Sequence, residues 1–389
     1  MSKIEEIIKE KCPHGVEYKT IKEITNVLRG KRLTTKELNE NEKFPVYHGG
    51  LEPLGYYHEF NRIGDTVMII NVGASAGTIG YCKDDFWSSD GCYCIEHRSV
   101  LLNRYLYHYL KNNEQYFMGR VRKAGIPTLD GSVIEKFKIA IPPIEVQEEI
   151  VKILDKFGEL EAELEAELEA RKSQYEFWRG KLISEIDGEN GKLIDLLSRP
   201  ITDGPHTTPK LVSEGIPFIS ATAIYDGKVH LQDAQGFITS EFDEECSKKY
   251  KPKKWDVYMV KSGSTTGKVA IVDIDDDFNI WSPLAAMRTE NETTARYLYH
   301  LLQTKDIQKQ VENKKSQGSQ PNLSMRVLEQ FDVKIPTLKD QERVVNILDK
   351  FDKLVNDISE GLPAEIEARR KQYAYYRNKL LSFEEVSCE

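Results

Sequence analysis

The sequence predicts an α+β fold in which two similar mixed domains are each followed by a long helix. Three observations support this prediction. Long stretches of the chain occur twice, short β-type runs are interleaved with helical segments without a regular βαβ period, and apolar residues recur at helical spacing near the end of each half. With 389 residues, the chain is long enough for two or three domains with real cores.

The duplication is clearest in two pairs of segments. Ile141–Phe157 and Ile335–Phe351 share ten of 17 residues at an offset of 194. Glu169–Ser184 and Glu367–Ser382 share nine of 16 residues at an offset of 198. The second copy is therefore four residues longer between the two matches. Shorter matches extend the repeat into the preceding halves: Gly73–Gly77 with Gly263–Gly267, Trp87–Ser88 with Trp281–Ser282, and Arg104–Leu110 with Arg296–Leu302.

Each half begins with the same expected succession of elements. A short helix (21–28; 193–197) leads to a loop with Gly or Pro. Runs rich in Val, Ile and Tyr predict strands at 66–72, 79–82, 256–260 and 269–272. A tyrosine-rich helix follows at 104–117 and at 295–309.

The helical blocks carry a narrow apolar stripe, which is typical of a coiled coil, because apolar residues recur in steps of three or four. The expected seam residues are Leu154, Phe157, Leu160, Leu164, Leu168, Tyr175, Trp178, Leu348, Phe351, Leu354, Tyr373 and Tyr376. Each block holds close to 40 residues, so a continuous helix would be ~60 Å long. In the second block, Gly361-Leu362-Pro363 is expected to break or kink the helix before Ala364.

Composition excludes several protein classes. No apolar run approaches the ~18 residues that span a bilayer, and the N-terminus lacks an apolar signal core, so the cytoplasm is the expected compartment. The net charge of −9 argues against a nucleic-acid binder, but the charge is uneven: 248–254 holds five lysines. Among the cysteines, Cys92 and Cys94 are expected on one strand face, where buried thiols are favoured over a metal site.

Common catalytic motifs are missing, which favours a non-catalytic chain. Gly263–Val269 resembles a phosphate loop, yet three residues separate its glycines instead of four, and Val269 replaces the Ser or Thr that would bind magnesium. A tight loop between strands is the favoured interpretation, and a loop that approaches phosphates or bases is the alternative. No Gly-x-Gly-x-x-Gly, HExxH or Asn/Asp-Pro-Pro-Tyr motif is found. His108 and His300 are expected to be satisfied packing residues.

Loops at equivalent places in the two halves differ most in sequence. They are rich in residue types that bond phosphates and base edges, although each such residue is also compatible with a simple solvated loop. The candidate DNA-binding residues are Arg29, Lys31, Arg32, Tyr47, His48, Ser75, Arg120, Arg122, Lys123, Asp203, His206, Thr207, Ser220, Thr222, Ser264, Thr265, Lys268, Lys314, Lys315 and Gln317.

The chain resembles the specificity (S, or HsdS) subunit of type I restriction–modification systems over nearly its whole length. The residues that carry the resemblance are the duplicated Ile-Pro…Ile-Leu-Asp-Lys-Phe blocks, 362–373, 376–380, Asp203-Gly-Pro-His206 and Cys12–Tyr18. The resemblance implies two target-recognition domains, at 1–143 and 188–337, each of which reads one half of a split, asymmetric site in double-stranded DNA. It implies that the helical regions 144–187 and 338–389 pair antiparallel around a pseudo-two-fold axis, set the gap and bind two modification subunits.

The resemblance also implies where the chemistry is done. S-adenosylmethionine, ATP and Mg are expected on the modification and restriction subunits, with no cofactor, catalytic residue or metal in this chain and no membrane partner. The alternative function is a tandem-repeat scaffold that binds proteins and not DNA. A fused enzyme and specificity chain is less favoured, because the chain has no residues for an added catalytic domain.

Overall fold

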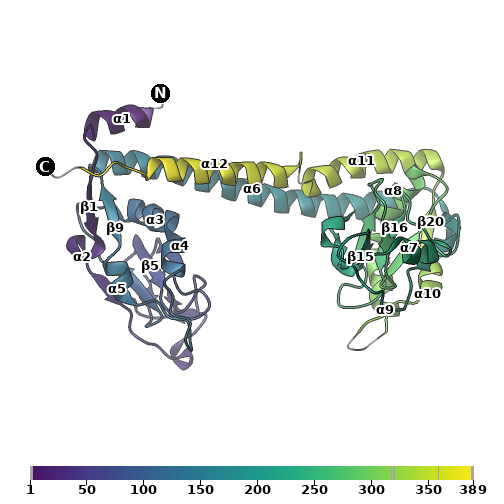
Figure 1. The fold of residues 1–389 in the computed structure, drawn as a ribbon, viewed down its shortest axis with the longest axis horizontal. Helices are drawn as coiled ribbons and strands as arrows, with labels where there is room; N and C mark the ends of the chain where they lie inside the picture. Colours follow the sequence, from purple (N-terminus) through teal and green to yellow (C-terminus); the bar gives the residue numbers. More distant parts are fainter. Residues whose placement is uncertain (1–2, 317, 319, 358, 387–389) are drawn as a thin grey trace. The chain divides into compact units, whose positions relative to one another are not determined.

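The computed structural model describes residues 3–316, 318, 320–357 and 359–386. The chain forms two compact units, one from Met1–Glu163 with Glu367–Glu389 and the other from Leu164–Ile366 (Figure 1). Each unit contains one globular domain and parts of the long helices. None of the helices within these described ranges is long and apolar enough to cross a membrane.

The first domain is built on three small sheets. The main antiparallel sheet has the order β2 (Val27–Arg29), β8 (Cys92–Ile95), β5 (Thr66–Ile70), β6 (Ile79–Cys82). A second sheet has the order β4 (Gly55–Tyr57), β3 (Phe44–Tyr47), β7 (Trp87–Ser88), and β1 (Glu17–Thr20) pairs with β9 (Lys138–Ile141). The helices are α2 (Ile21–Ile24), α3 (Asn103–Asn112), α4 (Glu114–Met118) and α5 (Gly131–Glu135).

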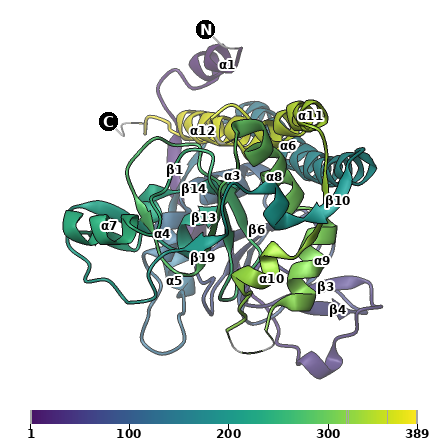
Figure 2. The same cartoon turned by 90° about the vertical axis from the view of Figure 1, so that its right-hand side faces the viewer.

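The second domain repeats this topology and adds to it. Its main sheet has the order β11 (Thr202–Asp203), β19 (Leu284–Met287), β16 (Val257–Val260), β17 (Val269–Ile271), β14 (Lys228–Val229), β13 (Ile224–Tyr225). The smaller sheets are β15 (Gly236–Ile238), β12 (Ile216–Ile219), β18 (Asn279–Ile280), and β10 (Glu189–Lys192) with β20 (Asp332–Ile335). The helices are α7 (Ser240–Ser247), α8 (Glu292–Leu302), α9 (Lys305–Lys314) and α10 (Met325–Glu329). The β13–β14 hairpin and α7, which lies at the margin in Figure 2, are the additions.

Both main sheets are buried on both faces, which explains their continuous apolar strands. In β5, Val67 and Ile69 pack with α3, while Met68 and Ile70 face a second core with Phe86. Successive side chains of a strand point to opposite faces, so an all-apolar strand requires two apolar environments. β16 divides in the same way between two cores. The sequence prediction of an α+β fold with strands at these places is confirmed.

Some predicted helix limits are wrong. The helix expected at 21–28 ends at Ile24, because Val27–Arg29 pairs with β8 instead. Each tyrosine-rich helix is two helices, which separate at Asn113 and near Thr304. Thr304 forms a helix cap, since its hydroxyl accepts a hydrogen bond from Ile307 N in the first turn of α9.

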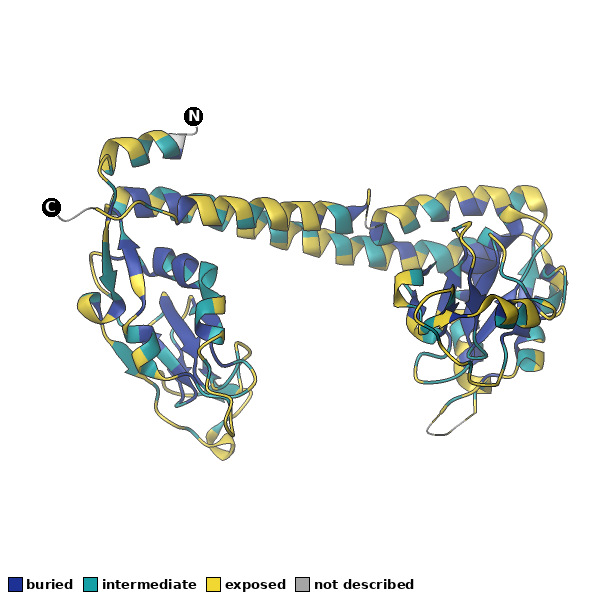
Figure 3. Ribbon diagram, viewed as in Figure 1, coloured by how far each residue is buried: buried dark blue, intermediate teal, exposed yellow. Residues whose placement is uncertain are grey.

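The first long helix, α6 (Ile144–Glu185), is one continuous element of 42 residues. Between Leu154 and Tyr175 none of its residues is buried, so its middle contributes little to either core (Figure 3). This stretch includes the repeated Leu-Glu-Ala-Glu tetrapeptide, and the boundary between the two compact units falls after Glu163.

The second helical block is interrupted, as the sequence predicted. α11 (Leu338–Asn356) ends before the break, and α12 (Leu362–Leu380) starts after it, with Pro363 in its first turn, where proline is tolerated. A Cβ at Gly361 would lie 2.5 Å from the Lys353 carbonyl oxygen, so the break has no space for a larger residue.

Parts of the long helices pair inside each unit. In the first unit, Phe157 of α6 stacks on Tyr373 and Tyr376 of α12, and Glu161 pairs with Arg370. Residue numbers rise along α6 while they fall along α12, so this pair is antiparallel. In the second unit, Tyr175 stacks on Phe351 of α11 at 6.2 Å. The expected seam residue Leu354 is exposed and Val355 is buried instead, because the apolar register shifts by one residue at the end of α11.

Candidate nucleic-acid interface

Four loops of the first domain meet at one edge of its main sheet, which we call the first loop edge. They follow β2 and β3, join β5 to β6, and form the hairpin at 120–128. Hydrogen bonds from Lys31 N to Ser88 O and from Ser89 N to Tyr47 O link the loops after β2 and β3 through the end of β7, at 2.9 and 3.0 Å. A bond from Gly73 N to Pro127 O links the β5–β6 loop to the hairpin, and one from Arg122 N to Thr128 O closes the hairpin itself, both at 2.9 Å. These segments are far apart in sequence, and the sheet topology brings them together.

The second domain builds an equivalent second loop edge. Equivalent backbone bonds run from Trp281 N to Ile219 O, Gly263 N to Pro321 O and Leu323 N to Lys261 O, at 2.7–2.9 Å. Gly30 and Gly204 occupy the same place in the two domains, and only glycine fits there. A Cβ added to Gly30 would lie 2.0 Å from Ser89 O, and a Cβ added to Gly204 would lie 1.8 Å from Ile280 O. The loop after α9 belongs to this edge, which points away from α11 in Figure 1.

Most candidate residues of the first loop edge present their side chains to solvent. Arg29, Lys31, Arg32, His48, Arg120, Arg122 and Lys123 are exposed, and Ser75 is partly buried. Tyr47 differs, because its ring packs against Phe86 at 5.6 Å and burial raises the pKa of its hydroxyl. This placement favours a packing role for Tyr47 beneath the loops.

The second loop edge carries different side chains on the same scaffold. His206, Thr207, Thr222, Ser264, Lys268 and Lys314 are exposed, Thr265 and Lys315 are partly buried, and Asp203 and Ser220 are buried. Gln317 lies outside the described residues. Gly263–Gly267 is the turn between β16 and β17, which confirms the interpretation as a tight loop between strands.

The lysine-rich run at 248–254 is less basic than its sequence suggests. Lys251 pairs with Asp243 and Asp277, both at 3.1 Å, and Lys254 pairs with Asp275 at 2.5 Å. Lys249 pairs with the buried Asp203, and no sequence pattern predicts this ion pair. The sequence carries little signal for this ion pair, because Asp203 and Lys249 are far apart in the chain.

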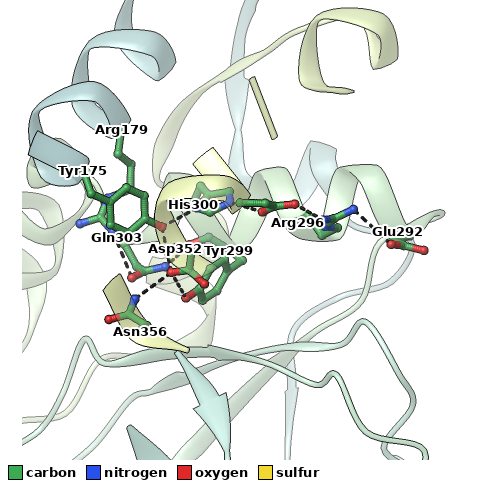
Figure 4. A network of polar contacts seen from close by, with 10 residues as sticks. Tyr175, Arg179, Glu292, Arg296, Tyr299, His300, Gln303, Asp352 and Asn356 are labelled. Atoms are coloured by element: carbon green, nitrogen blue, oxygen red, sulfur yellow. Dashed lines mark hydrogen bonds and ion pairs between the residues drawn. The ribbon is translucent and has the colours of Figure 1, made fainter. Parts of the chain in front are cut away.

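A histidine fixes each domain to its helices, and the same contact is built twice. On α3, His108 Nε2 lies 2.7 Å from Asp155 Oδ1 of α6, and its Nδ1 lies 3.5 Å from the Tyr373 hydroxyl of α12. On α8, His300 Nε2 lies 2.6 Å from Asp349 Oδ1 of α11, and its Nδ1 lies 3.0 Å from the Tyr175 hydroxyl of α6 (Figure 4). The expected packing role of both histidines is confirmed.

Electrostatics favours a neutral His108 beside an ionised Asp155. Burial lowers the pKa of His108, and the hydrogen bond with Asp155 offsets only part of this shift. Burial alone would raise the pKa of Asp155, but hydrogen bonds from His108 and Arg104 outweigh it and lower that pKa. The neutral ring then donates from Nε2 to Asp155 and accepts from Tyr373 at Nδ1.

We expect the α3 junction to weaken in mild acid. The pKa of His108 is lower in the folded chain than the unfolded value of ~6.5, so the unfolded chain binds more protons and stability falls as the pH drops below about 6.5. Amide hydrogen exchange in 103–112 should rise when the pH is lowered from 7.5 to 5.5, after correction for intrinsic rates. The His108→Gln variant should lose this dependence; an unchanged dependence in the variant would contradict the role of His108.

A further repeated feature lies on α6 and α12. Phe177 and Tyr375 occupy equivalent positions and are both 61% exposed. Each lies edge-on to the aromatic residue that follows it, with Phe177–Trp178 and Tyr375–Tyr376 both at 5.4 Å. We call these the two aromatic pairs. Sequence periodicity pointed to the second member of each pair and missed the more exposed first member.

The comparisons with known proteins agree with this architecture. The type I restriction modification DNA specificity domain matches the chain twice, at residues 13–170 and 200–368. The Haemophilus influenzae protein described as type I restriction enzyme specificity subunit S.HindORF215P is 33% identical, over 95% of this chain and 96% of that protein. The EcoR124I/EcoR124II specificity subunit of Escherichia coli is 32% identical, over 75% of this chain and 72% of that protein.

Among solved structures, the S subunit of a type I restriction–modification system from M. genitalium has the same fold. Its TM-score is 0.60 with 16% sequence identity, over 94% of this chain and 96% of that chain. Two specificity domains on one duplicated scaffold, together with these relatives, assign the chain. It belongs to the family of type I restriction–modification DNA specificity subunits.

Proposed function

We propose that this chain selects the DNA site of a type I restriction–modification complex without catalysing a reaction itself. The domain at 1–143 reads one half of a split, asymmetric site, and the domain at 188–337 reads the other half. The helical regions at 144–187 and 338–389 set the gap between the halves. Methyl transfer, with S-adenosylmethionine, and ATP-driven steps belong to partner subunits.

One observation carries this proposal: two equivalent loop edges present unlike side chains on like scaffolds. Readers with two-fold symmetry bind two half-sites, and different side chains on the two edges read different half-sites. The exposed arginines, lysines, serines and threonines of the loop edges supply phosphate and base contacts. A net charge of −9 is compatible with this role when partner subunits share the DNA.

The two aromatic pairs support binding of two modification subunits. Aromatic residues are frequent hot spots of protein–protein interfaces, and Phe177 and Tyr375 are both 61% exposed. Their equivalent positions, 198 residues apart in both pairs, offer one docking point in each copy of the repeat. A structure solved to explain complex assembly and conformational transition of the type I R-M system has a TM-score of 0.59 with this chain.

Exchange of residues 1–143 for the equivalent domain of another specificity subunit tests the division of labour. We expect sequencing of methylated bases in cells to show one new half-site, with the other half-site and the gap unchanged. The matched control exchanges 188–337 and should change only the other half-site. A change of both half-sites after either exchange would contradict the proposal, and a complex without sequence-specific DNA binding would favour a protein scaffold.

A further inference from the structure

A buried carboxylate in the second domain is surrounded by three basic groups, which we call the Asp203 cluster. Asp203 ends β11 and is 1% exposed. Lys249 Nζ lies 2.5 Å from its Oδ1, while His206 Nε2 and Lys261 Nζ lie 3.2 and 3.3 Å from its Oδ2. These residues come from three separate segments that converge at the second loop edge. Fixing a charge in the interior is costly unless it is paired, so this arrangement constrains all three segments.

The charges of the cluster do not balance. One carboxylate faces two ammonium groups, which leaves at least one positive charge without a counterion. In the part of the chain that the structure describes, neither Lys249 nor Lys261 has a second carboxylate within ion-pair distance. This distinguishes them from Lys251 and Lys254 of the same region, which pair with other aspartates.

The cluster also keeps hydrogen-bond donors for a ligand. An ammonium group has three N–H donors, and the carboxylate can accept only part of them. Asp203 Oδ2 makes no well-aligned hydrogen bond within the described residues, even though two nitrogen atoms lie within 3.3 Å. Lys261 is almost fully buried, whereas the side chains of Lys249 and His206 are 53% and 73% exposed, so the cluster is open to solvent on one side.

The first domain does not need such a cluster to fold. The scaffold positions that correspond to Asp203 and Lys261 are Arg29, next to the required Gly30, and Asn71. Arg29 is exposed, and the buried Asn71 Oδ1 has no hydrogen-bond partner among the described residues. The same topology therefore forms without the ion pairs, which argues against a purely structural role for the cluster.

We propose that the Asp203 cluster binds a backbone phosphate of the DNA at the second half-site. This inference rests on the proposed function. Lys249, Lys261 and His206 contact the phosphate, and Asp203 is a positioning residue that fixes the two lysines. Ammonium groups act as point charges that suit phosphate, and phosphate and sugar oxygens accept roughly half to two-thirds of protein–DNA hydrogen bonds.

Salt titration of the complete complex, with its modification subunits, on DNA that carries its site tests this proposal. Neutralising one phosphate contact should reduce the slope of log K against log salt by about 0.9. We expect this reduction for Lys249→Gln, which leaves the buried Asp203 paired with Lys261. The matched control is Lys254→Gln, which removes the same charge from the same lysine-rich run and should leave the slope unchanged.

The Asp203→Asn variant separates positioning from net charge. The substitution makes the domain more positive, so a simple charge effect would tighten DNA binding. Loss of the fixed positions of Lys249 and Lys261 should instead weaken DNA binding. Equal slopes for Lys249→Gln and Lys254→Gln would overturn the phosphate site. An altered base preference in the methylated second half-site of Lys249→Gln would overturn it in favour of a base contact. A wild-type complex that binds all DNA sequences equally would overturn the proposed function as well.

Discussion

A chain that lacks Leu164–Glu167 is expected to direct methylation to the same two half-sites with a shorter gap between them. Four helical residues span ~6 Å, which corresponds to one or two base pairs at ~3.4 Å each. The deletion removes one of two identical tetrapeptides, so the apolar register of α6 is retained. The shorter gap should be visible directly in the methylated DNA sequence, because intact domains still read both half-sites.

The structure gives a reason for expecting both domains to survive this deletion. The tetrapeptide starts at the boundary between the two compact units, and no residue of α6 between Leu154 and Tyr175 is buried. The aromatic contacts of Phe157 and of Tyr175 lie on either side of it. A length-preserving variant, Ala166→Gln, serves as the control and should leave the gap unchanged. An unchanged gap in the deletion variant would show that the helix does not set the spacing.

Removal of the two most exposed helix aromatics should release the modification subunits. Truncation of a hot-spot aromatic typically costs about 2 kcal/mol or more, a loss of roughly 30-fold in affinity. We therefore expect Phe177→Ala and Tyr375→Ala each to weaken the binding of one modification subunit. The double variant should lose both subunits from the complex. Native mass spectrometry of the purified complex gives the stoichiometry directly.

The control for this experiment is Phe60→Ala, since Phe60 is also a substantially exposed aromatic residue but lies in the first globular domain. That variant should retain two modification subunits. A double variant with unaltered stoichiometry would exclude the aromatic pairs as docking points. A single variant that loses both subunits would instead indicate that the two sites are coupled.

Local patterns in the sequence were sufficient to predict the repeated architecture. Strands such as Thr66–Ile70 are visible as apolar runs, and the interruption near Gly361 follows from glycine and proline. Helix limits were less predictable, because Val27–Arg29 joins a sheet whose partner strand is distant in sequence. Tertiary pairing outweighs local helix propensity there.

The candidate site was only partly predictable for the same reason. Apolar periodicity cannot decide which of two adjacent aromatics faces outward, so Trp178 was selected and Phe177 was missed. The Asp203–Lys261 ion pair joins residues that are near one another only after β11 and β16 enter the same sheet. The equivalent loops of the two domains, by contrast, could be identified from sequence, because the internal repeat aligns one half of the chain with the other.

The first compact unit contains both ends of the chain, and this arrangement has a consequence for biosynthesis. Leu380 and Leu381 are buried in the same core as Val16 and Tyr105, and Val16 N bonds to Glu384 O. Although the first domain is synthesised before the second, its core is completed only after α12 has been made, roughly 10 to 50 s later at 5–20 residues per second. The inner unit, Leu164–Ile366, is continuous in sequence and can finish folding earlier. The nascent chain thus exposes an unfinished apolar surface in its first domain until α12 has been synthesised.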